Sequence, residues 1–284
     1  MKPSIQILIN QAEDTWLSPL YSNAESLFSD AFLPSHDHTH HQRVWNLCKS
    51  LLQEISRMNS SIDPSLVEGL LIAAFFHDLG MVYSTREDHG KLGGELCKTW
   101  FRDKGIAFPH RFEEILEAIE LHDIKEKGSY SKINRSDQPR ILSLLSIADD
   151  LEAFGTIGIY RYAEIYLLRN ISLAQLGDRI LANAEARFQN LQESCELYPS
   201  IIAKHQMEYD ILRDFYQLYN IQLHKEAIPE EVLVGHLGVI NYIRALGLEK
   251  QNGPESFPDL LKNEDTLVNT YFRTLKNELE KARN

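Results

Sequence analysis

A histidine and an aspartate, His77 and Asp78, stand side by side at the end of an apolar stretch. The eight residues from Gly69 to Phe76 carry no charge and seven of them are apolar, so we expect a buried helix that ends at this pair. An unpaired carboxylate is costly to bury unless it takes up a proton. The pair therefore needs a counter-charge, and a metal ion would supply it. The simpler alternative is an aspartate that caps a neighbouring helix and a histidine with a hydrogen bond in the core.

Two further stretches contain residues that would complete a metal site. Residues 34–44 hold four histidines, of which His40 lies near the start of a predicted helix. Residues 145–151 hold Asp149. It lies four residues after Leu145 and eight after Ile141, so on a helix it shares their inward face, whereas Asp150 should point elsewhere. A histidine, a His-Asp pair and a distant aspartate give four nitrogen or oxygen ligands and no thiolate. Such a set suits Mn, Fe, Co, Ni, Zn or Mg and does not choose among them.

This combination resembles the HD superfamily of metal-dependent phosphohydrolases over roughly residues 34–160. The family pattern His-Asp-x-x-His-x-x-Arg-Val matches the chain from His36 to Val44, and Ala-Asp-x-Leu matches Ala148 to Leu151. Residues 145–162 are also similar to small stand-alone bacterial HD hydrolases. The resemblance implies an all-α fold and the metal ligands His40, His77, Asp78 and Asp149.

Two more histidines leave open whether the centre holds one metal ion or two. Some HD enzymes carry two additional histidines between the His-Asp pair and the last aspartate, and these bind a second ion. His89 and His122 lie in the corresponding intervals. With a second ion, Asp78 would be the bridging carboxylate. Otherwise one or both histidines would contact substrate or lie on the surface.

The remaining histidines near the first motif have other expected roles. We expect His36 and Asp37 to orient the loop or support the ligands, since metal-bound histidines usually have such partners. His38 and His41 fit a solvated loop with incidental metal affinity.

Three cations are candidates for binding a substrate phosphate. Arg43 shares a helix face with His40 and suits a phosphate, although an ion pair with a nearby carboxylate is an equal alternative. Lys91 and Lys125 lie near loops, where solvated lysines are the commoner outcome. The polar loop 125–137 has the length and position of an active-site lid.

Helical periodicity dominates the chain, and no sustained alternation predicts a strand. We expect an all-α HD helical bundle with additional C-terminal helices. Its parts would be an N-terminal helical extension (1–33), the HD metal-binding core (34–160) and a C-terminal helical region packed on the core (161–284). We expect one or two amphipathic helices over 4–32 with a break near Pro19, and helices over 229–247 and 264–282.

Composition narrows the class of partners. The net charge of −12 disfavours binding to nucleic acid or to an anionic membrane.

Three cysteines without C-x-x-C spacing argue against a disulfide framework and fit a reducing cytoplasm. No uninterrupted apolar run approaches 18 residues and no signal peptide is recognisable, so we expect no membrane segment. A homodimer is compatible with this composition.

The resemblance implies hydrolysis of a phosphomonoester or phosphodiester, in a small substrate such as a nucleotide, by a metal-activated water. Asp78 would bind the metal and help position the water, and Arg43 would bind phosphate. Two alternatives remain open. One is a di-iron HD oxygenase or hydratase acting on a carbon substrate. The other is a non-catalytic regulator whose metal site is structural.

Overall fold

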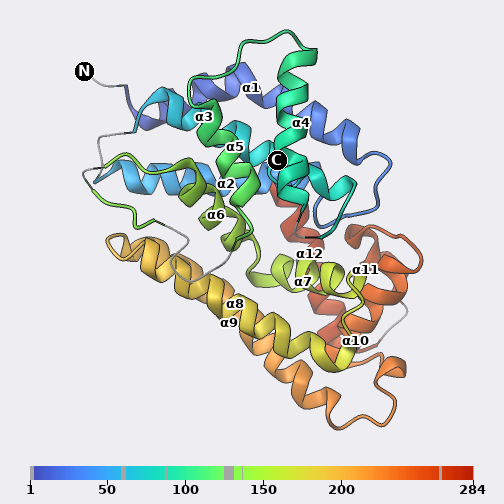
Figure 1. Ribbon diagram of the computed structural model, residues 1–284. Helices are drawn as coiled ribbons and strands as arrows, with labels where there is room; N and C mark the ends of the chain where they lie inside the picture. Colours follow the sequence, from blue (N-terminus) through green and yellow to red (C-terminus); the bar gives the residue numbers. More distant parts are fainter. Residues whose placement is uncertain are drawn as a thin grey trace. The chain divides into compact units, whose positions relative to one another are not determined.

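A computed structural model describes residues 3–58, 62–86, 88–124, 131–135, 137–261 and 264–283 (Figure 1). The described residues form helices and connecting segments without any β-strand, which confirms the predicted all-α class. The chain forms two compact units. Unit 1 comprises residues 1–151 and 189–204, and unit 2 comprises residues 152–188 and 205–284.

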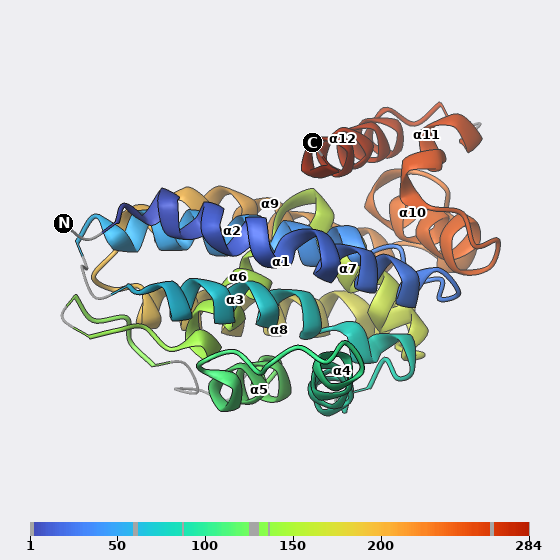
Figure 2. The same cartoon turned by 90° about the horizontal axis from the view of Figure 1, so that it is seen from above.

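Unit 1 is built around α3 (Pro64–Phe76), from which the 3₁₀ turn η1 (Leu79–Val82) follows. Its last seven residues, Leu70 to Phe76, have no exposed surface. Figure 2 shows α3 between a layer of two helices and a second layer of two others, and α3 contacts all four. These neighbours are α1 (Ile5–Phe28), α2 (His38–Ser56), α4 (His89–Asp103) and α5 (Phe112–Leu121). The sixth helix, α6 (Ile141–Glu152), packs its first residue against Gly69 of α3.

Two aspartates fix the starts of the central helices. Asp37 caps α2 by accepting hydrogen bonds from the backbone N–H groups of Thr39 and His40. Asp63 caps α3 in the same way through Leu66 N, directly before the proline at the first helical position. Each cap satisfies backbone donors that have no partner inside the helix.

The predicted break near Pro19 is wrong, because α1 continues through this residue. Proline removes one backbone hydrogen bond from a helix. Pro19 lies on the exposed face, so water can bind the carbonyl that loses its partner. Buried Trp16 and Leu20 hold the helix against the core on both sides of the proline.

The segment Pro64–Val82 meets the length and composition of a membrane-spanning helix, with a mean hydropathy of 1.5 over its best window. The segment contains no uninterrupted apolar run of that length, because Glu68 lies within it. However, 83% of that window is buried inside the protein, as is usual for the core helix of a folded domain.

Unit 2 contains the remaining helices. The predicted helix over 229–247 is wrong in part, because the structure has a 3₁₀ turn (Pro229–Glu231), then α10 (Gly235–Tyr242), then a π-helical segment (Ile243–Leu248). Gly235 has a φ of +64°, a conformation that ends any helix running into it. The helices after α6 are α7 (Gly155–Leu168), α8 (Leu173–Ser194), α9 (Pro199–Leu223), α10 (Gly235–Tyr242), α11 (Phe257–Leu260) and α12 (Thr266–Arg283). Helices α8 and α9 each contribute residues to both units.

Candidate metal centre

The central pair of the site lies where α3 ends. His77 is the C-terminal cap residue of α3, and Asp78 leaves the helical conformation with φ −105° and ψ 4°. Both side chains are almost completely buried. The helix therefore ends at a buried carboxylate, as the sequence predicts, and the 3₁₀ turn that follows was not part of that prediction.

The first cluster consists of His40, His77, Asp78 and Asp149, from three helices and the turn after α3. Asp78 Oδ2 lies 3.2 Å from His40 Nε2 and 3.4 Å from His77 Nε2. Asp149 Oδ1 lies 4.0 Å from His40 Nε2 and 3.9 Å from His77 Nε2. The two histidine Nε2 atoms are 3.1 Å apart.

The second cluster consists of Asp78, His89 and His122. The other carboxylate oxygen, Asp78 Oδ1, lies 3.3 Å from His89 Nε2 and 3.1 Å from His122 Nε2. The two histidine Nε2 atoms are 3.4 Å apart. Asp78 therefore presents one oxygen to each pair of histidines.

Backbone carbonyls fix which nitrogen of three histidines carries the proton. Nδ1 of His77, His89 and His122 lies 2.9, 2.6 and 2.8 Å from the carbonyl oxygen three residues earlier. A carbonyl oxygen only accepts, so Nδ1 must donate, and a neutral ring then has a lone pair on Nε2. All three lone pairs point toward the oxygens of Asp78. Acceptors that converge in this way need a cation between them.

The spacing of these donors fits metal ions. Two atoms bound to one ion at about 2.1 Å lie between about 3.0 and about 4.2 Å apart, depending on the angle between the bonds. The histidine–histidine and histidine–carboxylate distances within both clusters run from 3.1 to 4.0 Å, inside that range. The 3.9 and 4.0 Å separations are too long for hydrogen bonds but suitable for ligands of a shared ion.

Protonation equilibria favour an ionised carboxylate at the centre. Burial by itself would raise the pKa of Asp78, but the charge of His77 and the contacts with His122, His40 and His89 in their protonated forms bring it well below its usual value. Burial lowers the pKa of His77 to about 3, so this ring is neutral and able to bind metal. Burial also acts to lower the pKa of His89, but the contact with Asp78 outweighs it and raises the value to about 9.

Glycines bring α4 close enough to supply His89. A Cβ on Gly93 would lie 2.6 Å from the carbonyl oxygen of Phe76 and 3.1 Å from that of His77. A Cβ on Gly80 would lie 2.0 Å from the carbonyl oxygen of His89. Sequence analysis did not identify these glycines as part of the site. Their spacing beside the histidines, in His89-Gly-x-x-Gly93, is the signal that was available.

The histidine-rich segment 36–41, which runs into the first turn of α2, differs from expectation at one position. His41, predicted in a solvated loop, is fully buried, and its Nδ1 donates to Ala74 O, which also accepts from His77. Its ring packs against Phe75 because the first turn of α2 faces the core. His36 lies with its ring centre 5.4 Å from that of His40, and its Nδ1 lies 2.6 Å from Ser35 Oγ.

The remaining predicted residues have mixed placements. Arg43 is buried on α2, and its Nη1 donates to Thr39 Oγ1 at 2.8 Å. Asp150 is as buried as Asp149 but is not part of either cluster. Lys91 is exposed.

The predicted lid is only partly described. Lys125, with the rest of residues 125–130, and Ser136 lie outside the described residues. In the described part of this loop, Ile133 N donates to Ser194 O at 3.0 Å, and Lys132 pairs with Glu196 at 2.8 Å.

Comparison with protein families agrees with this geometry. Residues 38–153 match the family model described as HD domain, and all six cluster residues lie within that range. The chain contains an HD domain. This domain is typical of a superfamily of metal-dependent hydrolases, and its His and Asp cluster suits a divalent metal ion. No curated protein and no solved structure matches the chain significantly.

Proposed function

We propose that this HD domain holds two divalent metal ions bridged by Asp78, and that the protein hydrolyses a phosphate ester of a small substrate, a nucleotide. The observation that carries the proposal is the division of the Asp78 carboxylate, with Oδ2 toward His40 and His77 and Oδ1 toward His89 and His122. A centre with one ion would need only one of these pairs.

The ligand count supports catalysis over a purely structural role. The first cluster offers four protein ligands and the second offers three. A six-coordinate ion would keep two positions open in the first cluster and three in the second, whereas structural sites are usually closed by protein ligands. Bound divalent ions would polarise a phosphoryl oxygen and lower the pKa of water, which are the contributions that ester hydrolysis requires.

The protein side chains would position and neutralise the reacting groups. Asp78 would hold both ions at a fixed separation through its two oxygens. His40 follows Asp37, whose carboxylate caps α2, so the first ligand is fixed at a rigid helix start. Arg43 lies one turn further along α2 and would supply positive charge for the substrate phosphate.

The net charge supports a small substrate over nucleic acid. A net charge of −12 disfavours extended nucleic acid, whose binding depends on many phosphate contacts with cations. A small anion needs only the local positive field of a metal centre. A nucleotide meets both conditions.

The test is hydrolysis by protein stripped with a chelator and then supplied with Mn²⁺. The substrates are p-nitrophenyl phosphate, bis(p-nitrophenyl) phosphate and a panel of mono-, cyclic and dinucleotides. We expect metal-dependent hydrolysis that persists without oxygen and falls at least about 100-fold in Asp78→Asn, since loss of outer-shell partners alone costs 10–100-fold. The matched control is Asp88→Asn, an exposed aspartate beside His89.

Two results would contradict the proposal. Oxygen-dependent turnover with an iron signal in the visible or EPR spectrum would favour the oxygenase alternative. A metal-loaded protein that hydrolyses none of these esters would favour a regulatory role.

A further inference from the structure

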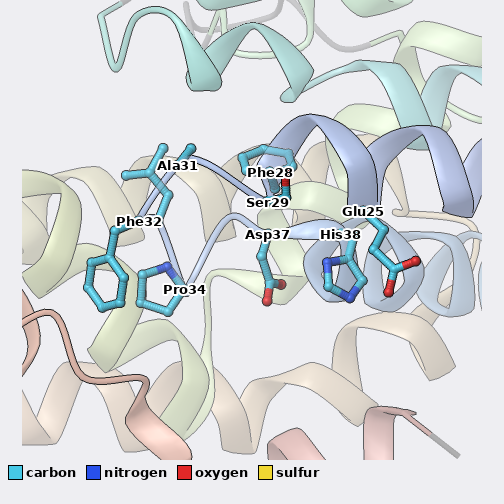
Figure 3. A pocket seen from close by; sticks show the side chains of 9 residues that line it. Glu25, Phe28, Ser29, Ala31, Phe32, Pro34, Asp37 and His38 are labelled. Carbon is cyan, nitrogen blue, oxygen red and sulfur yellow. The ribbon is translucent and has the colours of Figure 1, made fainter.

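A cavity opens between the end of α1 and the start of α2, in unit 1. Its volume is about 280 Å³, close to the lower end of small-molecule pockets at roughly 300–1,000 Å³. That size suits one flat ring system better than a whole dinucleotide. The lining residues are Glu25, Phe28, Ser29, Ala31, Phe32, Leu33, Pro34, Asp37 and His38 (Figure 3).

The chemistry of the lining is apolar and acidic. Phe28 and Phe32 supply aromatic rings, and Glu25 and Asp37 supply two carboxylates. None of the nine lining residues is a lysine or an arginine. Figure 3 shows both carboxylates and the His38 ring on the same side of the segment that connects α1 to α2. Such a cavity repels phosphate and accepts a flat group that donates hydrogen bonds.

One acceptor in the cavity wall has remaining capacity. The hydrogen bonds that cap α2, from Thr39 N, Thr39 Oγ1 and His40 N, all end on Asp37 Oδ1. Within the described part of the chain, no hydrogen bond reaches Asp37 Oδ2. Glu25 is exposed at the rim and makes no ion pair with a described residue. Both carboxylates can therefore accept a hydrogen bond from a ligand.

The cavity is next to the metal centre. Asp37 accepts from the backbone of His40 at 3.3 Å, and three residues of helix span about 4.5 Å. Phe28, in the cavity wall, packs its ring 5.6 Å from His41, whose ring lies 5.1 Å from that of His77. Side chains of the first turn of α2 therefore separate the cavity from the metal centre, and the proposal below assigns the two ends of one small molecule to these two places.

We propose that this cavity binds the base of the nucleotide substrate, with preference for bases that carry an exocyclic amino group. A carboxylate accepts from such an amino group, and aromatic rings stack on bases. The proposal rests on the proposed hydrolase function, since it assigns the phosphate to the metal centre and the base to this cavity.

The experiment measures binding of free nucleosides to the full-length, metal-loaded protein by calorimetry. Nucleosides lack phosphate, so the result does not depend on turnover. We expect cytidine, adenosine or guanosine to bind at least about tenfold more tightly than uridine, the gain typical of hydrogen bonds to a charged group. Glu25→Gln, Asp37→Asn and Phe32→Ala should each weaken that binding, and raise KM for the matching nucleotide. Asparagine still caps a helix, so Asp37→Asn keeps α2 intact.

Matched controls are Glu95→Gln and Phe108→Ala, which change an exposed glutamate and an exposed phenylalanine elsewhere in unit 1. These should bind nucleosides like the wild type. Two results would overturn the proposed base site and leave the proposed hydrolase function intact. One is hydrolysis of nucleotides by a protein that binds no nucleoside. The other is nucleoside binding that Glu25→Gln, Asp37→Asn and Phe32→Ala leave unchanged. Preference for tetramethylammonium over every nucleoside would also overturn the base site. Amino-specific nucleoside binding without hydrolysis would support the base site and count against the hydrolase.

Discussion

At the scale of single residues, the central feature is the buried carboxylate of Asp78 among four imidazoles. Three of those rings, on His77, His89 and His122, donate Nδ1–H to a carbonyl three residues earlier. His77 and His122 are helix C-cap residues, where backbone carbonyls lack partners within the helix. The last carbonyls of α3 and α5 therefore accept from Nδ1 of His77 and His122, and this contact turns the Nε2 atoms toward Asp78.

The two clusters should respond differently to pH. His89 has its pKa raised to about 9 by Asp78, so in metal-free protein it holds a proton that a metal ion in the second cluster must displace. His77, with a pKa of about 3, holds none at neutral pH. Because metal binds the deprotonated ring, we expect affinity in the second cluster to fall about tenfold per unit as pH drops below 9.

Calorimetric titration with Mn²⁺ at pH 6, 7 and 8 measures this difference. The weaker equivalent should lose about 100-fold in affinity between pH 8 and pH 6, and the tighter one should lose less. An equal loss for both equivalents would contradict the assignment of the proton to His89.

Residue types and order were sufficient to predict all six cluster residues as candidates. The division of Asp78 between two histidine pairs was not predictable, because it depends on how α4 and α5 approach the end of α3. The burial of His41 was missed for a related reason. Four histidines within six residues suggest a polar loop, and only the packing of α2 distinguishes those that face the core.

At the scale of elements, the position of α4 determines whether the second cluster can form. Gly93 lies against the carbonyls of Phe76 and His77, backbone atoms that cannot move aside. Gly93→Ala should push α4 away from α3 and separate His89 from Asp78. We expect a loss of about 1–3 kcal/mol in stability, typical of overpacking, and weaker binding of the second metal ion while the first is retained.

Denaturant unfolding and metal titration test this expectation. The control is Gly247→Ala, whose Cβ would meet its nearest neighbour at an ordinary 3.4 Å. Normal binding of both ions by Gly93→Ala would show that α4 does not depend on this close approach.

Element types were largely predictable, and the errors have local causes. The helix starts at His38 and Pro64 follow from capping residues that are visible in the sequence. The continuity of α1 through Pro19 was not visible, because it depends on which face of the helix is exposed.

At the scale of the whole molecule, all six cluster residues belong to unit 1. They join α2, α4, α6 and the ends of α3 and α5, so bound metal should stabilise this unit. Ligand in 100-fold excess over its Kd contributes about 2.7 kcal/mol. We expect removal of metal to reduce amide protection from hydrogen exchange in α2, α3 and α5.

Hydrogen exchange followed by mass spectrometry, with and without chelator, measures that protection. Helices α10 and α12 of unit 2 serve as the internal reference and should be unchanged. Loss of protection throughout unit 2, with unit 1 unaffected, would place the metal elsewhere. The division of the chain into these units was not predicted from sequence, because α8 and α9 contribute to both and no composition change marks the boundary.

The central claim is a dinuclear centre bridged by Asp78, and metal content per chain tests it most directly. Elemental analysis should find two equivalents in the wild type and in the exposed-histidine control His110→Ala. It should find one equivalent in His122→Ala and almost none in Asp78→Ala. One equivalent in the wild type, unchanged in His122→Ala, would contradict the account.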